Sequence, residues 1–360
     1  MKNFYVQDNE AGQRLDKLLG KLLNKAPKSF LYKMLRKKNI VLNGKKADGS
    51  EKLAPKDLIT FFLSDETMAN FTEQAEAVVV NKELELVYED SHILVVNKPI
   101  GELSQKADKE DVSMVEYIIS YLLRSGQLTR EQLASFKPGI CNRLDRNTSG
   151  LLIAGKSLTG LQEMSEVMRD RSLGKYYLCI VKGRLEGKQR VEGYLSKDEA
   201  LNKVTIHSMK TEAADYICTE YQPILTYAGP GSAPAAKAVR QAKGEAASVR
   251  TGLRGETEQE NRGSFTLLEV KLITGRSHQI RAHLASLGHP LIGDFKYGDQ
   301  KTNHYFKAKY GLSHQLLHSY RMVFPELKGE LAYLSGKELK AEQSDLFLRI
   351  QKDLFGMQIY

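Results

Sequence analysis

The first forty residues carry the apolar spacing of two short helices. Leucines recur at the i, i+3, i+4 and i+7 positions of one buried helical face, at Leu15, Leu18, Leu19, Leu22 and Leu23. A second apolar set follows Pro27 and includes Phe30, Leu31, Met34 and Leu35. We expect Ser29 to cap this second helix, because a serine hydroxyl accepts a hydrogen bond from the free N–H groups of a first turn.

Short apolar runs after residue 39 predict strands. Ile40–Leu42 is followed by Asn43-Gly44, a dipeptide that favours a hairpin because both residues tolerate the positive φ of a type I′ turn. Leu58–Leu63 then predicts a closing strand. The polar, acidic stretch at 64–83 predicts a linker, so residues 1–63 are expected to form a small module of their own.

The rest of the chain, residues 84–360, mixes strands and helices without strict βαβ alternation. A hairpin is predicted between 84 and 96, and Ser113 with Glu116 forms the capping box of a helix. Further strands are predicted at 176–181, 204–207, 214–221, 265–273 and 318–324, and helices at 158–169 and 279–287. The pattern favours an α+β fold with a mixed, largely antiparallel sheet flanked by helices.

Residues 228–263 differ from the segments on either side. They are rich in Ala, Gly, Ser and Glu and contain no aromatic residue. Such a composition cannot bury enough surface to offset the entropy lost on ordering. We therefore expect a disordered insertion between two strands.

Composition excludes several classes of protein. The 360 residues suit two domains, and 41% hydrophobic residues suffice for a sizeable core. No apolar run is long enough to span a membrane, and the N-terminus lacks the apolar core of a signal peptide. The three cysteines form no CxxC pair. These features predict a soluble, cytoplasmic protein, which we expect to be a monomer.

Positive charge is concentrated in the N-terminal module. The whole chain has a net charge of +9, and residues 1–63 hold fourteen basic and six acidic residues. A solvated, lysine-rich surface is the simpler interpretation, but so one-sided a run favours a nucleic-acid partner. The expected contacts of this module with RNA are Arg14, Lys17, Lys33, Arg36, Lys37 and Lys45.

A polar loop before an apolar strand holds the first candidate for chemistry. Asp145 lies between Arg143 and Arg146, and the loop ends at Gly150 before Leu151–Ala154. Neighbouring cations keep a carboxylate ionised, so Asp145 could act as a nucleophile, a base or half of a structural ion pair. Local chemistry alone favours the structural ion pair.

The segment from Leu272 to Leu284 holds a second candidate. Its apolar spacing predicts a helix from Gln279, which places Arg276 near the helix N-terminus, where a cation is unfavourable. Such a cation calls for an anion, either a carboxylate of this chain or a phosphate. The spacing of His278, His283 and His289 does not favour a metal site.

A third candidate is the aromatic pair in the strand predicted at 176–181. Tyr177 shares one face with Cys179, and Tyr176 lies on the other. Packing within the sheet is the default interpretation of both rings. The alternative is that one ring stacks on an extruded base.

These segments together resemble the RluA family of pseudouridine synthases. The match comprises Arg143-Leu144-Asp145 with Thr148-Ser149-Gly150, Tyr177 with Cys179 and Gly183, Gly275 to Arg281, His289 to Asp294, and Asn97-Lys98-Pro99. Asn142 departs from the pattern, because the family usually has a histidine there, and the anchoring of the loop is expected to differ. Residues 12–63 resemble an S4 RNA-binding domain.

The resemblance implies isomerisation of uridine to pseudouridine in RNA, without cofactor or metal. It implies that Asp145 is the essential carboxylate, that Arg276 pairs with Asp145, and that Tyr177 faces the flipped base. It further implies contacts with RNA by Arg143, Arg146 and Arg281. The S4-like module suggests large-subunit (23S) ribosomal RNA as the substrate. Transfer RNA, or a non-catalytic role in ribosome assembly, are the alternatives.

Overall fold

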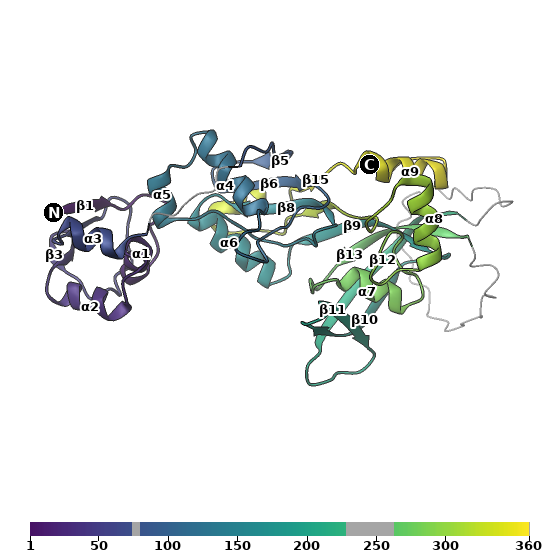
Figure 1. Cartoon of the computed structure of the whole chain (residues 1–360), viewed down its shortest axis with the longest axis horizontal. Helices are drawn as coiled ribbons and strands as arrows, with labels where there is room; N and C mark the ends of the chain where they lie inside the picture. Colours follow the sequence, from purple (N-terminus) through teal and green to yellow (C-terminus); the bar gives the residue numbers. More distant parts are fainter. Residues whose placement is uncertain (74–79, 228–262, 360) are drawn as a thin grey trace.

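The computed structural model describes residues 1–73, 80–227 and 263–359. The chain forms an elongated molecule with a small N-terminal module at one end (Figure 1). The insertion expected at 228–263 lies outside the described residues, apart from Gly263. Among the described residues, no helix is both long and apolar enough to cross a membrane.

The N-terminal module is a four-stranded sheet packed against helices. Its strands lie in the order β1-β4-β2-β3. The predicted leucine face of α1 is buried, with Leu15, Leu18 and Leu19 in the core of the module. The elements are β1 (Lys2–Tyr5), α1 (Leu15–Leu22), α2 (Lys28–Arg36), β2 (Ile40–Leu42), β3 (Lys45–Lys46), β4 (Leu58–Phe61) and α3 (Asp65–Phe71).

Of two local predictions for this module, the hairpin is confirmed and the helix cap is wrong. The hairpin predicted between β2 and β3 is confirmed, with Asn43 and Gly44 at φ 48° and 71°, as a type I′ turn requires. The cap predicted at Ser29 is wrong, because α2 begins at Lys28 with the extended Pro27 as its N-cap residue. Proline fits this place because it has no N–H group to satisfy and a fixed φ.

The assignment of residues 64–71 to a linker is also wrong. They form α3, whose N-cap Ser64 accepts a hydrogen bond from the Thr67 N–H. The rings of Phe71 and Phe30 lie 4.3 Å apart, so α3 packs on the module. Two of the acidic residues of the predicted linker, Asp65 and Glu66, stand in the first turn of this helix, where negative charge is favourable.

The large domain is built on an eleven-stranded sheet, which confirms the predicted α+β class. Nine strands follow the order β11-β10-β12-β13-β9-β14-β8-β6-β5, while β15 pairs with β14 and β7 with β8. Pairing is antiparallel except between β14 and β8. The strands are β5 (Leu86–Glu89), β6 (Ile93–Lys98), β7 (Gly139–Ile140), β8 (Ser149–Gly155), β9 (Gly174–Lys182), β10 (Gln189–Asp198), β11 (Lys203–His207), β12 (Asp215–Tyr227), β13 (Phe265–Leu272), β14 (Leu317–Val323) and β15 (Glu338–Lys340).

Helices flank this sheet (Figure 1). The capping box predicted at Ser113 is present at the start of α4. The helix predicted at 158–169 has these bounds in the structure, and the one predicted at 279–287 ends one residue earlier. The helices are α4 (Met114–Arg124), α5 (Arg130–Ser135), α6 (Leu158–Arg169), α7 (Gln279–Ser286), α8 (Gln300–Tyr310), α9 (Asp345–Phe355) and the short 3₁₀ helix η1 (Gly329–Leu334).

The parallel pair β8–β14 lies at the centre of the sheet. All seven residues of β8 are buried, and Ser149 and Gly150 pair with His318 and Ser319 of β14. A Cβ atom at Gly150 would lie 2.2 Å from the Ser319 carbonyl oxygen, and its φ is +112°. Only glycine allows so close an approach in this conformation. The polar loop before β8 is thereby fixed against the middle of the sheet.

The module and the large domain meet at one buried polar contact. The Ser135 hydroxyl, at the end of α5, donates to Glu10 Oε1 at 2.5 Å, and both residues are buried. Glu10 Oε2 accepts from the Gln7 N–H at 2.7 Å. The Glu10 carboxylate therefore connects the backbone of the N-terminal module to α5 of the large domain.

Candidate active site

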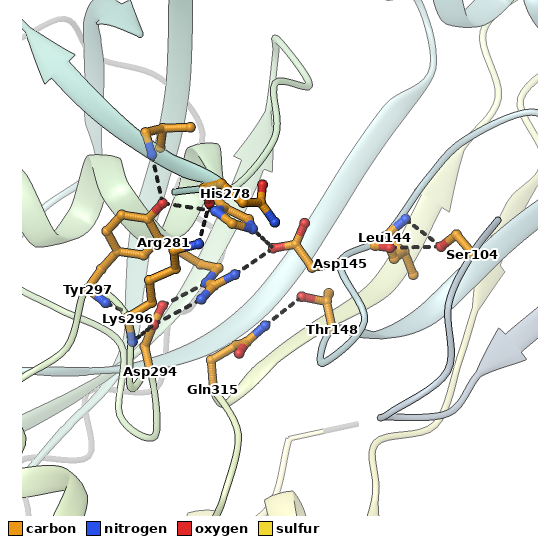
Figure 2. Close-up of polar contacts among 12 residues, drawn as sticks. Ser104, Leu144, Asp145, Thr148, His278, Arg281, Asp294, Lys296, Tyr297 and Gln315 are labelled. Carbon is orange, nitrogen blue, oxygen red and sulfur yellow. Dashed lines mark hydrogen bonds and ion pairs between the residues drawn. The ribbon is translucent and has the colours of Figure 1, made fainter. Parts of the chain in front are cut away.

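Asp145 lies in an open pocket of about 350 Å³ beside the central strands. The polar loop before β8, strand β9 and the segment that leads into α7 form its walls. The side chain of Asp145 is 26% exposed, and Figure 2 shows its carboxylate beside His278 and Arg281. Three of the motifs singled out in the sequence, at Asp145, Tyr177 and Gly275–Arg281, thus meet in one cavity.

Arg281 holds two carboxylates at once (Figure 2). Its Nη1 donates to Asp145 Oδ2 at 3.0 Å, while Nε and Nη2 bind Asp294 at 2.7 and 3.0 Å. Burial raises the pKa of Asp294, but the hydrogen bonds and charge of Arg281 outweigh it and leave that pKa lowered. Arg281, which the resemblance implies as an RNA contact, is mostly buried, and its guanidinium binds both carboxylates at the pocket wall.

The predicted pairing of Arg276 with Asp145 is wrong. Arg276 Nη2 pairs with Asp215 at 3.1 Å, and both side chains are largely exposed. The helix α7 begins at Gln279, and the Gln279 side chain accepts from the Arg276 N–H at 3.1 Å. Arg276 therefore precedes the first turn of α7, and the carboxylate that pairs with it belongs to Asp215, at the start of β12. It still lines the pocket.

His278 approaches the same oxygen of Asp145 as Arg281. Its Nε2 lies 4.0 Å from Asp145 Oδ2, and its Nδ1 lies 2.9 Å from the Tyr297 hydroxyl. That hydroxyl accepts the Val204 N–H at 3.0 Å, so its own hydrogen is available to His278 Nδ1. Burial lowers the pKa of His278, although the charge of Asp145 opposes this. A neutral imidazole whose Nδ1 accepts from Tyr297 carries its hydrogen on Nε2, the nitrogen nearer to Asp145.

Removing the Tyr297 hydroxyl tests this arrangement. We expect Tyr297→Phe to lower kcat about 5-fold, because His278 loses the hydrogen bond that fixes its tautomer, worth about 1 kcal/mol. Single-turnover assays measure the rate of the chemical step. Tyr305→Phe, at an exposed tyrosine of α8, is the control and should retain the wild-type rate. Equal rates for both variants would contradict a role for the hydroxyl.

Tyr177 forms part of the pocket wall from β9. Its side chain is buried, and burial raises the pKa of its phenol to about 12, with a smaller raising effect from the charge of Asp145. The phenol is therefore neutral at physiological pH. Its ring packs with Leu144 and Leu317 in one apolar cluster. Tyr177 can thus offer both an apolar face and a hydroxyl to a ligand.

Lys98 fixes the backbone next to Asp145. This fully buried lysine donates to the carbonyl oxygens of Pro99, Glu102 and Arg146 at 2.9, 2.8 and 3.0 Å. Burial lowers its pKa to about 8, and the three hydrogen bonds use all three hydrogens of the ammonium group. The Arg146 carbonyl also accepts the Gly101 N–H. The Asn-Lys-Pro motif of the sequence therefore supports the loop from behind.

Further polar contacts fix the rest of this loop. The Ser104 hydroxyl donates to the Leu144 carbonyl at 2.8 Å and accepts the Leu144 N–H at 3.0 Å. Gln315 donates to the Thr148 hydroxyl at 3.2 Å (Figure 2). Asn142 bonds the backbone of β8 at both ends of its amide, at 3.2 and 2.8 Å. The residue that departs from the family pattern thus anchors the loop directly.

The other residues expected to contact RNA lie at the surface. Arg143 and Arg146 are exposed, and of these two Arg143 lines the pocket. In the module, Arg14 is paired with Asp16 at 3.0 Å. The remaining basic residues named there are also exposed: Lys17 on α1, Lys33 and Arg36 on α2, Lys37 directly after α2, and Lys45 on β3. Sequence reasoning missed two cations of the pocket itself, Arg171 and Lys175.

The histidines considered for a metal make separate contacts. His283 Nδ1 bonds Thr219 at 3.0 Å, and His289 Nδ1 bonds the Lys182 carbonyl at 3.0 Å, whereas His278 bonds Tyr297. Within the described ranges, no three His, Cys, Asp or Glu side chains are grouped as metal ligands.

Residues 92–286 match the model of the family described as RNA pseudouridylate synthase. The chain belongs to this family. It is therefore an RNA pseudouridine synthase, and RNA is its substrate.

Similar proteins cover nearly the whole of this pseudouridine synthase. Ribosomal large subunit pseudouridine synthase C of Vibrio vulnificus is 27% identical over 89% of this chain and 87% of its own length. The enzyme of the same name from Escherichia coli is 28% identical over the same shares. An RNA pseudouridine synthase of Mycoplasma genitalium is 28% identical over 90% of each chain.

A solved structure shares the fold of this pseudouridine synthase. Human RNA pseudouridylate synthase domain containing 4 aligns with a TM-score of 0.51, over 75% of this chain and 92% of that chain. The two sequences are 18% identical there, so the likeness concerns the fold.

Proposed function

We propose that this enzyme isomerises uridines in large-subunit ribosomal RNA, and that Asp145 is the carboxylate that acts on the sugar. The observation that carries the role of Asp145 is its asymmetric anchoring. Arg281 binds Oδ2 and His278 lies on the same oxygen. Among the described residues, no side chain is recorded within bonding distance of Oδ1, which is free to react.

The reaction requires two things of the protein, this carboxylate and a pocket that fits the uridine. The N-glycosidic bond of uridine breaks, the uracil turns, and C5 bonds to C1′. Asp145 acts as a nucleophile at C1′ or as a base on the sugar, and both routes use an ionised oxygen next to the ribose. The buried Arg281, shared with Asp294, keeps that charge in place.

The pocket is suited to a base that has left its stack. Extrusion of a nucleotide costs a few kcal/mol, and less in a loop. The buried, neutral Tyr177 offers a flat apolar face for the uracil and a hydroxyl for proton transfer. Arg143, exposed at the mouth, is placed to fill the gap in the RNA stack or to bind phosphate.

The choice of ribosomal RNA rests on the relatives. Two of them are named as synthases of the large ribosomal subunit, and they align with about nine-tenths of this chain. The basic surface of the N-terminal module supplies the electrostatic contact that a large folded RNA requires.

The test is modification of defined RNAs by the purified full chain. We expect pseudouridine in 23S RNA transcribed without modifications and none in transfer RNA transcripts, mapped by chemical labelling and reverse transcription. Modification of transfer RNA alone would refute the ribosomal assignment. Tight binding of 23S RNA without any pseudouridine would refute the catalytic assignment and favour a role in assembly.

The basic module should dominate the dependence of RNA binding on salt. Replacing Lys33 and Arg36 of α2 and the adjacent Lys37 by alanine should lower the slope of log Kd against log salt by about 2–3, because each lost phosphate contact removes about 0.7–0.9. Fluorescence anisotropy at several salt concentrations measures this slope. Alanine at Lys307, Lys309 and Lys352, which lie on α8 and α9, serves as the charge-matched control. An unchanged slope for the α2 variant would show that RNA does not bind there.

A further inference from the structure

Two cations beside Tyr177 have no use in the site as described so far. Lys175 precedes Tyr177 by two residues on β9, so both side chains lie on the same face of the strand, and both line the pocket. Arg171 lines the same pocket and follows the end of α6. Its φ is +57°, a left-handed conformation that is uncommon for arginine.

Neither cation is compensated by the protein. Among the described residues, no carboxylate lies within ion-pair distance of Lys175 or Arg171, and no side-chain hydrogen bond is recorded for either. Of the other arginines of the pocket wall, Arg281 is bound to two carboxylates and Arg276 to Asp215, while Arg143 is exposed to solvent. The acidic Asp170 next to Arg171 faces Arg169 instead, at 3.8 Å.

The surroundings of Lys175 disfavour an ammonium group that has no anionic partner. The side chain is half-buried, and its Nζ would lie 3.6 Å from a Cβ atom built on Gly275 across the pocket. Burial and then the charge of Arg171 both lower the pKa of Lys175. A solvated surface lysine would have neither constraint. Arg171 itself is exposed, and a half-buried lysine beside this second cation favours the binding of an external anion.

The position of the pair identifies the anion. Tyr177 and Asp145 form the part of the pocket that receives the base and the ribose, and Lys175 lies about 7 Å from Tyr177 along the strand. A phosphate group attached to that ribose would therefore reach the Lys175 side of the pocket. Arg143 and Arg276 are exposed at the mouth and can bind RNA outside the pocket.

We propose that Lys175 and Arg171 form a phosphate site that binds the backbone phosphate next to the uridine entering the pocket. The inference rests on the proposed function, in which uridine enters this pocket. It assigns a part of the RNA ligand to two residues that the catalytic step does not use.

The experiment couples a change in the protein to a change in the RNA. The probe is a stem-loop of 23S RNA that the full chain binds, prepared with one neutral methylphosphonate at each loop phosphate in turn. Kd is measured by anisotropy for wild type and for Lys175→Met, which keeps the length of the side chain without its charge. We expect Lys175→Met to weaken binding of the unmodified loop by about 5- to 20-fold.

The decisive result is a loss of additivity at one position. At the phosphate bound by Lys175, the methylphosphonate should weaken wild type about as much as the substitution does, and should not weaken Lys175→Met any further. Additive effects at every loop phosphate would overturn the proposal. Lys352→Met on α9 is the matched control and should show no coupling.

Two additions keep the outcome interpretable. Arg171→Asn, which suits the left-handed backbone, should couple to the same phosphate, and it tests the site if Lys175→Met does not fold. Turnover of the same stem-loop by wild type is measured separately. Absence of pseudouridine in this stem-loop would refute the proposed function. The coupling of Kd values is measured without turnover and tests only the phosphate site.

Discussion

Replacing Asp145 by asparagine is expected to lower pseudouridine formation by at least about 10³-fold. The amide is nearly isosteric with the carboxylate and can still accept a hydrogen bond from Arg281, so the loop before β8 keeps its position. What is lost is the ionised oxygen next to the ribose. Single-turnover assays on 23S RNA, with chemical mapping of pseudouridine, measure the loss.

Two further measurements show whether chemistry alone is affected. Asp145→Asn should melt within a few degrees of wild type, because Asp145 is partly exposed and Arg281 retains Asp294 as its partner. Its Kd for RNA should also stay close to that of wild type. A variant that forms pseudouridine at more than a tenth of the wild-type rate would exclude Asp145 as the reacting group.

Replacing Arg281 by methionine should damage both stability and activity. The substitution leaves Asp294, which is fully buried, without its bidentate partner, and loss of one member of a buried ion pair costs about 3–5 kcal/mol. It also frees Asp145 Oδ2 from its anchor. Denaturant unfolding and turnover of 23S RNA measure the two effects on the same preparation.

A second substitution separates the two effects of Arg281. In Arg281→Met combined with Asp294→Asn, no buried charge remains at position 294, and the amide can still accept the Lys296 and Tyr297 N–H groups. We expect much of the lost stability to return, while turnover stays low because Asp145 is still unanchored. Recovery of turnover together with stability would show that Arg281 serves the fold alone.

The elements that the sequence predicted well are those set by local spacing. The apolar periodicity of α6 located both of its ends, and Asn43-Gly44 located its turn, because each signal depends on residues that are neighbours in the chain. The helix α3 was missed because its polar residues form few helical contacts of their own. It is held mainly by packing of Phe71 on Phe30, forty-one positions earlier.

In the candidate site too, local motifs were predicted well and contacts between distant residues were not. The motifs around Asp145, Tyr177 and Gly275–Arg281 were recognised from the sequence, and the structure brings them together in one pocket. The partner of Asp145 was misjudged because an argument from the helix terminus considers only local charge. Arg281 faces Asp145 from inside α7, and its second partner, Asp294, lies beyond the helix.

Arg171 and Lys175 were missed for a related reason. Neither belongs to a motif, and basic residues near strand and helix ends are common in any sequence. Their significance depends on what is absent around them, namely a carboxylate of this chain, and that becomes visible only when the described side chains are placed in space.

The position of β14 in the sheet has a consequence for synthesis of the enzyme. In the described chain, β14 alone joins β8, which follows the loop that holds Asp145, to β9, which carries Tyr177. Because β14 spans Leu317–Val323, its first residue is added 172 residues after Asp145 during translation. At about 5–20 residues per second, about 9–36 seconds separate translation of Asp145 from completion of its pocket. Until β14 has been made, a nascent chain therefore cannot complete the pocket in which Asp145 and Tyr177 meet.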